Sequence, residues 1–506
     1  MDAARNALLQ IYNRNERPDL IDKILQELDV HPLSVTLLAT VAHENDWDND
    51  RLGREWEEHR TDALRTAHGN GLAAAIEFSL ASTMFKELGS DARGLLEVIA
   101  FYPQGVKETH VDWLFPTVSN INIIFDILCI LSLTYRSNGY VTMLAPLQDY
   151  FRPRYPKSSP LLCATKEGYF NRLSVDVDPS EPGFEEAQWI ASEDVNVEHL
   201  LDVFTSIDSD SDDVWDASAK FMRHLCWHAA PRQTALRSKI EQLSDDHCSK
   251  PMCLFELSQL FQGVGNFTEQ KRLLIHALKL STGRGDDKQV ADAVYGLSTA
   301  NMMLGLYEEG IQQAKEALVI YEGLGNTVRQ EYCLISLACL LLEDEQLDAA
   351  EEVITTLHTI GNLPERGQEY LVCSIHYLFG RLYGAKGEVE EAIHRYNEGL
   401  RIASTFSWLD LSFWIHYSLA QLFYDQDKFD EAHVHLKQAK ECAIGDLYLG
   451  YAAELDTQIW YKQRRLEDAL SEALHALEAY GKIGAAGGVE DVRGLLRLIE
   501  QAKEAP

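Results

Sequence analysis

Small and apolar residues recur at helical spacing throughout the C-terminal half of the chain. In residues 305–321, an aromatic residue follows a turn glycine, and Gly310, Ala314 and Ala317 then fall on one face of a helix. The same pattern begins again at five other turn residues, Gly265, Glu345, Gly387, Asp427 and Arg464. Successive turns are 40, 40, 42, 40 and 37 residues apart. This period predicts a solenoid of stacked helix pairs over residues 252–483.

The small residues indicate which kind of solenoid to expect. A period near 40 also fits HEAT and armadillo repeats. Here, however, small residues near the start and the end of each second helix would let two helices approach closely, as they do in tetratricopeptide repeats (TPRs). These residues are Gly310, Ala350, Ala392, Ala432 and Ala469 at the start, and Ala277, Ala317, Gly399, Ala439 and Ala476 at the end. We expect six TPRs with lengthened helices, covered by a last helix over residues 488–502.

The first helix of each TPR conventionally lines the concave groove of the stack. On this register the groove residues are Tyr295, Thr299, Tyr377, Arg381, Trp414, Tyr417, Gln421, Tyr424 and Glu454. Aromatic residues and arginine are enriched at binding hot spots, and the alternative is that these side chains cover contacts between repeats. A lysine and asparagines that would clamp a C-terminal carboxylate are absent from these positions, which argues against recognition of chaperone tails.

Closely spaced helices are also expected before the repeats. Pro18 and Pro32 stand where the first turn of a helix tolerates proline. A strongly charged helix is predicted over residues 50–60, and the serine before Pro160 is suited to capping another helix.

A loop and two amphipathic helices should connect this region to the repeats. Residues 177–186 contain two prolines and a glycine, which indicates a loop. The helices are predicted over residues 193–204 and 212–228, with an acidic stretch between them. We expect both to form a helical connector that packs on the first repeat.

Several segments of the N-terminal region resemble a known family when taken in order. Residues 31–39 (HPLSVTLLA) look like the GLPL-type segment of NB-ARC and related STAND nucleotidase domains. Residues 72–106, 111–116 and 124–133 resemble the winged-helix domain of that family, and residues 140–153 fall where it has its MHD-type motif. Followed by TPRs, this order is most similar to NB-ARC–TPR proteins of the NLR-like class, which is abundant in mushroom-forming fungi.

Two features of that family are missing from the sequence. We find neither a GxxxxGK[ST] loop to bind phosphates nor the acidic strand that would hold magnesium. Leu144 stands where the MHD-type motif has its histidine. The resemblance implies that Pro32 lies beside the adenine ring in an intact family member, whereas here we expect a helix start. No cofactor is expected unless a missing N-terminal core supplies an ADP or ATP site, as it would if this were a truncated gene model.

The expected fold is nearly all-α, with a helical and winged-helix N-terminal region followed by a TPR superhelix. The predicted segments are residues 1–66 (ARC1-like helices), 67–156 (winged helix), 157–250 (connector), 251–486 (TPRs) and 487–506 (capping helix).

Composition excludes several classes of partner. The chain has 79 acidic and 45 basic residues and a net charge of −34, which disfavours nucleic acid and anionic membranes. The most apolar run, residues 121–135, is too short to span a bilayer. Nine scattered cysteines and the lack of a visible signal peptide favour reduced thiols and a cytoplasmic location.

Metal and catalytic chemistry are not expected. His224 and His228 lie one helical turn apart, with His247, Cys248 and Cys253 further on, but no CxxC pair accompanies them. Packed side chains are the simpler interpretation. The acidic runs are interpreted as solvated turns, and no GxSxG or Cys/His signature is present.

Three hypotheses about function follow. The first is a non-enzymatic sensor region, in which the TPR groove binds a protein or peptide and regulates an NB-ARC switch that this chain does not contain. The second is an ADP/ATP-binding STAND nucleotidase with non-standard motifs. The third is a free-standing adaptor that self-associates through its N-terminal helices.

Overall fold

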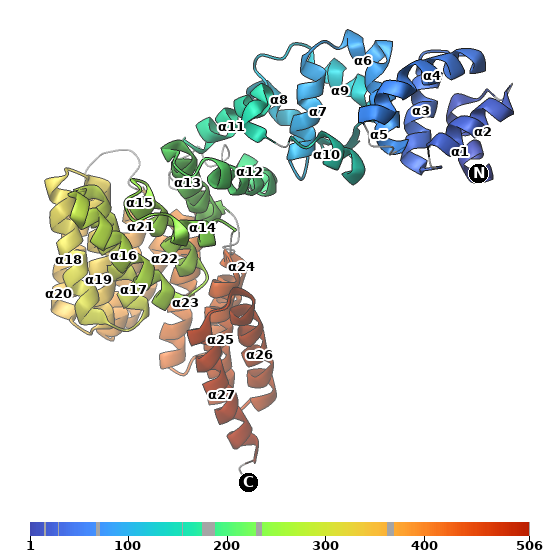
Figure 1. Ribbon diagram of the computed structural model, residues 1–506. Coiled ribbons are helices and arrows are strands. Elements are labelled where there is room, and N and C mark those ends of the chain that lie inside the picture. Colours follow the sequence, from blue (N-terminus) through green and yellow to red (C-terminus); the bar gives the residue numbers. More distant parts are fainter. Residues whose placement is uncertain are drawn as a thin grey trace. The chain divides into compact units, whose positions relative to one another are not determined.

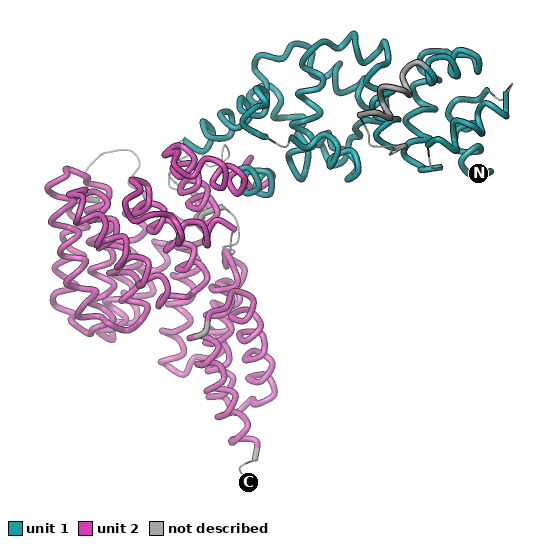
Figure 2. The backbone as a smooth tube through the Cα atoms, viewed as in Figure 1, with its two compact units in different colours: residues 1–175, 193–200 teal, residues 176–192, 201–506 magenta. Residues whose placement is uncertain are grey.

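The computed structural model describes residues 1–14, 17–28, 30–66, 71–153, 155–174, 188–228, 235–361 and 369–504. This part of the chain is nearly all helical, which confirms the expected fold class. It forms two compact units, shown in Figure 2. Unit 1 comprises residues 1–175 and 193–200, and unit 2 comprises residues 176–192 and 201–506. The loop expected over residues 177–186 lies outside the described residues.

Unit 1 begins with a group of short helices. These are α1 (Asp2–Tyr12), α2 (Pro18–Glu27), α3 (Pro32–Glu44), α4 (Asn49–Thr66), α5 (Gly71–Ala81) and α6 (Thr83–Glu87). Pro18 and Pro32 each begin a helix, as predicted, because the N–H that proline lacks has no partner within a first turn. Trp47 and Trp56 both meet the ring of Phe78 edge-on in the core.

A small sheet lies in the second part of unit 1. The elements here are α7 (Asp91–Phe101), β1 (Val106–Lys107), η1 (Glu108–His110), α8 (Val111–Leu114), α9 (Ile121–Ile130), β2 (Tyr135–Ser137), β3 (Tyr140–Thr142), α10 (Ala145–Phe151), η2 (Pro156–Ser158) and α11 (Pro160–Leu173). The strands are antiparallel in the order β1–β3–β2, with Val106 and Arg136 paired to opposite sides of Val141. Gly105 has φ +80°, and a Cβ there would lie 2.3 Å from the Val141 carbonyl oxygen. Only glycine therefore fits the entry to β1.

One expected helix cap is not made. Ser159 precedes α11, but its hydroxyl forms no hydrogen bond to the first turn of that helix. It donates instead to the Glu97 carboxylate at 2.9 Å. The predicted capping role of this serine is therefore wrong, because a carboxylate on α7 is a stronger acceptor within reach.

A buried polar cluster holds the middle of α12 (Gln188–Ile207), residues 193–200, in unit 1. The fully buried Glu193 carboxylate accepts hydrogen bonds from the Tyr169 hydroxyl at 2.7 Å and the Asn196 amide at 2.8 Å. His110 Nδ1 lies 3.1 Å from the same carboxylate. These partners compensate the cost of burying a carboxylate.

Unit 2 contains α13 (Asp212–His228), α14 (Leu236–Gln242) and a regular array of helix pairs (Figure 1). The first helix of each pair, helix A, is α15 (Lys250–Gly263), α17 (Asp287–Met303), α19 (Thr327–Glu343), α21 (Glu369–Ala385), α23 (Leu409–Asp425) or α25 (Asp446–Lys462). The second, helix B, is α16 (Phe267–Arg284), α18 (Tyr307–Gly323), α20 (Leu347–Gly361), α22 (Val389–Phe406), α24 (Phe429–Cys442) or α26 (Leu466–Ile483). The last helix is α27 (Ala486–Glu504), which packs on α26, and α13 and α14 pack on α15. The predicted repeats are confirmed.

Small residues let the helices of the array approach closely. Gly310, Ala314 and Ala317 are buried on one face of α18, as the pattern predicted. A Cβ on Gly380 of α21 would lie 2.5 Å from the ring of Tyr396 in α22. Side chains of ordinary size at these positions would force the packed helices apart.

Helices A lie on the inner side of the array. Each helix A contacts the next helix A along the array, whereas successive helices B, over their described residues, make little contact with one another. An array whose members meet on one side and diverge on the other is curved, and the side where they meet is concave. We call the solvent-facing side of helices A the inner face.

The first and the last repeats of the array also contact each other, because the array curves back on itself. Gly265, in the first A–B turn, lies so close to Leu447 of α25 and Ala485 before α27 that a Cβ would be 2.9 Å and 3.2 Å from their side chains. The equivalent turn residues include Glu345 and Asp427, which also have positive φ. The backbone conformation alone therefore does not require glycine at position 265. Close packing between the first and the sixth repeat is what requires glycine at this position.

No helix of the described residues is long and apolar enough to cross a membrane.

Candidate functional site

The inner face consists of three rows of equivalent positions on helices A. The rows lie five, eight and twelve residues after the first residue of each helix A from α17 to α25, a spacing that keeps them on one helical face. The middle row is Tyr295, Ile335, Tyr377, Tyr417 and Glu454. The flanking rows are Asp292, Tyr332, Ser374, Trp414 and Tyr451 on one side, and Thr299, Cys339, Arg381, Gln421 and Gln458 on the other.

The predicted groove residues all lie on this face. Eight of the nine fall in the three rows, and Tyr424 extends the face toward the end of α23. Each of the nine is half-buried. Tyr332 and Tyr451 were not among the predicted groove residues, although the period alone places both at the position of Trp414.

Aromatic rings are concentrated in the fifth and sixth repeats. The ring of Trp414 lies 6.0 Å from Tyr417, 5.7 Å from Tyr448 and 5.9 Å from Tyr451, measured between centroids. We call these four residues the aromatic wall. The aromatic wall joins α23 to α25. All four of its residues are half-buried, so part of the wall is exposed to solvent.

Burial makes several tyrosines near the inner face harder to ionise. It raises the pKa of Tyr295, Tyr377 and Tyr417 above the usual value for a phenol, and it raises the pKa of Tyr448 to about 12. At physiological pH these hydroxyl groups are hydrogen-bond donors as well as acceptors.

Several predicted groove residues also make contacts between repeats. The Arg381 guanidinium donates to the Glu343 carboxylate at 2.5 Å and lies 5.9 Å from the centre of the Tyr377 ring. The Tyr424 ring faces Lys462 Nζ at 4.6 Å. These contacts support the alternative of inter-repeat packing, but half-buried side chains remain available to a ligand, so the groove role of the nine residues stays a prediction.

The remaining three polar residues differ in their partners. Thr299 donates to the Gly296 carbonyl oxygen within its own helix, at 2.8 Å. Gln421 donates to Asp425 at 3.0 Å. Glu454 accepts a hydrogen bond from the buried Tyr480 hydroxyl at 2.9 Å, and burial raises the pKa of this carboxyl.

Pro32 lies apart from the inner face, in unit 1. It is exposed at the first position of α3, and its carbonyl oxygen accepts a hydrogen bond from Thr36. The described contacts of Pro32 are those of a helix start.

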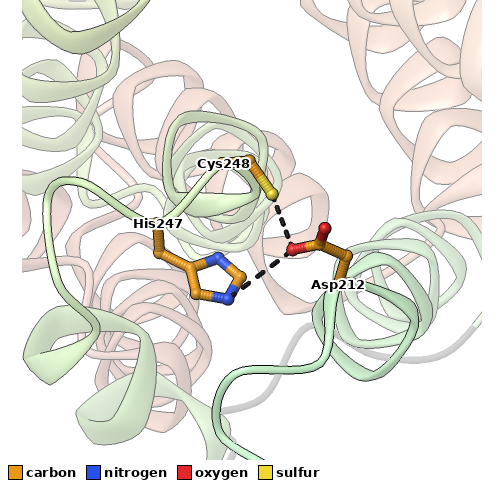
Figure 3. A group of neighbouring side chains, drawn as sticks. All are labelled: Asp212, His247 and Cys248. Carbon is orange, nitrogen blue, oxygen red and sulfur yellow. Dashed lines mark hydrogen bonds and ion pairs between the residues drawn. The ribbon is translucent and has the colours of Figure 1, made fainter.

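Three potential metal ligands meet in unit 2, although no metal site was expected from the sequence. Figure 3 shows Asp212, His247 and Cys248, whose ligand atoms lie within 4.8 Å of one another. Cys248 Sγ donates to the Asp212 carboxylate at 2.6 Å, and His247 Nε2 lies 3.7 Å from the same oxygen. Because His247 Nδ1 accepts a hydrogen bond from the Ser249 amide, Nε2 of a neutral ring carries the proton. The three groups are thus joined to one another by hydrogen bonds and charge.

The other histidines and cysteines considered from the sequence are placed elsewhere. His224 is buried on α13, and the side chain of His228 lies outside the described residues. Cys253 is fully buried, its thiol lies 3.5 Å from the Trp215 carbonyl oxygen, and burial raises its pKa.

Comparison with known proteins yields structural matches alone. No protein-family model matches the sequence, and no curated protein does. A STAND (Signal Transduction ATPase with Numerous Domains) protein with a tetratricopeptide repeat sensor, from Pyrococcus horikoshii, matches with a TM-score of 0.50 and 12% identity, over 93% of this chain and 72% of that chain.

Two structures of a quorum sensor resemble the chain over a shorter length. The apo form of NprR from B. thuringiensis has a TM-score of 0.40 and 12% identity, over 67% of this chain and 99% of its own. NprR with its cognate peptide NprX has a TM-score of 0.43 and 13% identity, over 65% and 100%. The likeness to the STAND protein, together with the repeat geometry, shows that the array is a TPR-like helical solenoid.

Proposed function

We propose that the inner face of the array binds a segment of another protein or a peptide. The observation that carries this proposal is the periodic placement of aromatic side chains on successive helices A, half-buried and facing the concave side. A core residue would be fully covered, and a purely solvated face would be polar. A face that carries at least one partly exposed ring on each helix A from α17 to α25 instead has the composition of a protein-binding surface.

The array is suited to such a role because its side chains are already held in place. The aromatic wall is fixed by contacts between its own rings, and Arg381 is fixed by Glu343. Groups that are ordered before binding lose little entropy on binding. We propose binding, and no catalysis, as the task of this surface.

We further propose that the chain is the sensor region of a STAND-type signalling protein of the NLR-like class. The resemblance of residues 31–39 and 72–153 to ARC and winged-helix segments supports this, as does the likeness to a STAND protein with a TPR sensor over most of the chain. Ligand binding would then bias a nucleotide-dependent switch supplied from outside this sequence. The nine free cysteines fit a cytoplasmic location.

The first test is a selection of linear peptides on the full chain. Purified protein selects binders from a library of random peptides, and the affinity of each binder is measured for the chain and for the variants Trp414→Ala and Tyr417→Ala. Loss of an anchoring aromatic residue should weaken binding by about tenfold or more. Phe406→Ala is the control, because Phe406 is exposed at the end of α22, away from the inner face. Binders that tolerate both wall variants would contradict the proposal.

Calorimetry with ADP and ATP tests the competing nucleotidase hypothesis. We expect no tight, magnesium-dependent binding, because the sequence contains no phosphate-binding loop. Tight binding that is lost in Pro32→Ala would favour the nucleotidase instead.

A further inference from the structure

Charges are distributed unevenly along the inner face. Arg381 is neutralised by Glu343 at 2.5 Å, and Lys462, at the end of α25, by Asp427 at 2.7 Å. These two cations are therefore already paired with carboxylates. A ligand that carries negative charge would have to compete with those carboxylates.

Glu454 is the opposite case. Among the described residues, no lysine, arginine or histidine lies within ion-pair distance of its carboxylate, and its hydrogen-bond partner is the neutral Tyr480 hydroxyl at 2.9 Å. Burial disfavours its charge, and the nearby carboxylate of Asp491 on α27 disfavours it further. A carboxylate offers about four lone-pair sites, so most of the acceptor capacity of Glu454 is unused.

The aromatic wall lies next to this carboxylate. Tyr417 occupies the same position on α23 that Glu454 occupies on α25, and these two neighbouring helices contact each other. Burial, and to a smaller extent the charge of Glu454, raises the pKa of Tyr417. Tyr451 is influenced by Glu454 in the same way and contacts the ring of Tyr480 at 6.1 Å. The faces of tyrosine and tryptophan rings attract cations.

We propose that this end of the inner face, formed by α23, α25 and α27, binds a positively charged group of the peptide ligand. The guanidinium of an arginine or the ammonium of a lysine would pair with Glu454 and Asp491 and lie against the rings of Trp414 and Tyr417. This inference rests on the proposed peptide-binding function and adds the chemistry of one ligand position.

The other kinds of ligand group fit this end of the face less well. An anion would face two carboxylates that form no ion pair with a cation in the described part of the chain. An apolar side chain would remove more water from Glu454 and leave its acceptor sites empty, which costs free energy. A cation alone satisfies both the carboxylates and the ring faces.

The experiment uses the peptides selected on the full chain. Each arginine or lysine of a binder is replaced in turn by citrulline or norleucine, which removes its charge, and affinities are measured for the unmodified chain and for Glu454→Gln. One replacement should weaken binding by about tenfold or more, and the same replacement should have little effect in Glu454→Gln. Asp491→Asn should give a smaller loss, because this residue is exposed.

Controls separate a specific cation site from the general attraction of cationic peptides to an acidic protein. Glu500→Gln removes the same charge from an exposed position on α27 and should leave affinity unchanged. Glutamine still offers an oxygen to the Tyr480 hydroxyl, so the melting temperature of Glu454→Gln should not fall. Because the changes in the peptide leave the protein intact, the result does not depend on that variant alone.

Each outcome decides one question. Binders that need the aromatic wall but contain no cation sensitive to Glu454→Gln would overturn this inference and leave the proposed function standing. A loss of equal size in Glu500→Gln would also overturn it. Failure to recover any binder that depends on Trp414 or Tyr417 would contradict the proposed function and this inference together.

Discussion

Among the described residues, unit 1 has a single buried charged side chain, Glu193, at the centre of a polar cluster, whereas most of the core of unit 2 repeats the same kinds of apolar residue in every helix pair. The buried charges of unit 2, Lys250, Glu256 and Asp456, lie apart from this repeating pattern. In unit 1, Glu193 receives hydrogen bonds from residues of two helices and lies beside His110, and no second cluster of this kind occurs among its described residues. In unit 2, a small residue in one helix faces a ring or a branched side chain in the next, pair after pair. Destabilising substitutions in unit 1 should therefore act mainly through this one cluster. In unit 2, a destabilising substitution should affect mainly its own repeat and the neighbouring repeats.

Replacing Glu193 should have the largest effect. Glu193→Ala leaves the Tyr169 hydroxyl and the Asn196 amide without their buried acceptor, and breaking such a cluster costs about 3–5 kcal/mol. Hydrogen exchange of peptides from unit 1, measured at increasing denaturant concentration, gives the loss. Glu57→Ala is the control, because its ion pair with Lys23 is mostly exposed and should contribute less than about 0.5 kcal/mol. Equal effects of the two substitutions would remove the contrast between the units.

Replacing Gly265 tests whether contacts between the first and the sixth repeat stabilise the array, in addition to the contacts between neighbouring repeats. In Gly265→Ala, the new Cβ would meet Leu447 and Ala485, and overpacking of this kind costs about 1–3 kcal/mol. Gly305→Ala is the matched control, since Gly305 has almost the same positive φ and a methyl group there would have no atom within 4 Å. The difference in free energy of unfolding isolates the packing term, and small-angle X-ray scattering should show an expanded array for Gly265→Ala only. Identical values for the two variants would show that the contact contributes nothing.

The same contact shows how far the sequence could predict the structure. Residues 310, 314 and 317 indicated close helix packing because their spacing recurs in every repeat, so the signal is averaged over six copies. The contact of Gly265 with Leu447 occurs once and joins residues 182 positions apart, so no local period contains it. The period is enough to find Tyr332 and Tyr451. It cannot predict the hydrogen bond from Tyr480 to Glu454, because a period places residues on a helical face and does not say which side-chain atoms of two helices meet.

A histidine pair in the fifth repeat should make unit 2 sensitive to acid. His416 and His435 are half-buried, with their Nδ1 atoms 3.2 Å apart, so they can share one proton but not carry two charges easily. Burial, and for His416 also the charge of His435, lowers the pKa of both rings, that of His416 to about 4. The unfolded chain therefore binds more protons between about pH 6.5 and pH 4, and stability should fall as the pH drops through this window, by roughly 1–2 kcal/mol.

Melting temperatures across that window check the prediction. His416→Gln should flatten the pH dependence, while His475→Gln should not, because His475 is mostly exposed. A pH profile unchanged by His416→Gln would assign the acid sensitivity to other groups. Above about pH 6.5 both variants and the unmodified chain should show little change.

The smallest effect is expected for Arg381→Lys, which bears on whether inner-face residues serve packing, binding or both. Lysine keeps the charge opposite Glu343 but loses the planar group that lies over the Tyr377 ring, so stability should fall by less than about 1 kcal/mol. Arg401→Lys is the control, because Arg401 is mostly exposed and pairs with Glu398 on its own helix. If Arg381 only joins the fourth repeat to the third, peptide affinity should be unchanged in Arg381→Lys despite the loss of stability. If Arg381 also contacts the ligand, the substitution should lower the free energy of peptide binding by more than it lowers the free energy of unfolding, because a ligand lying on the inner face would meet the guanidinium directly.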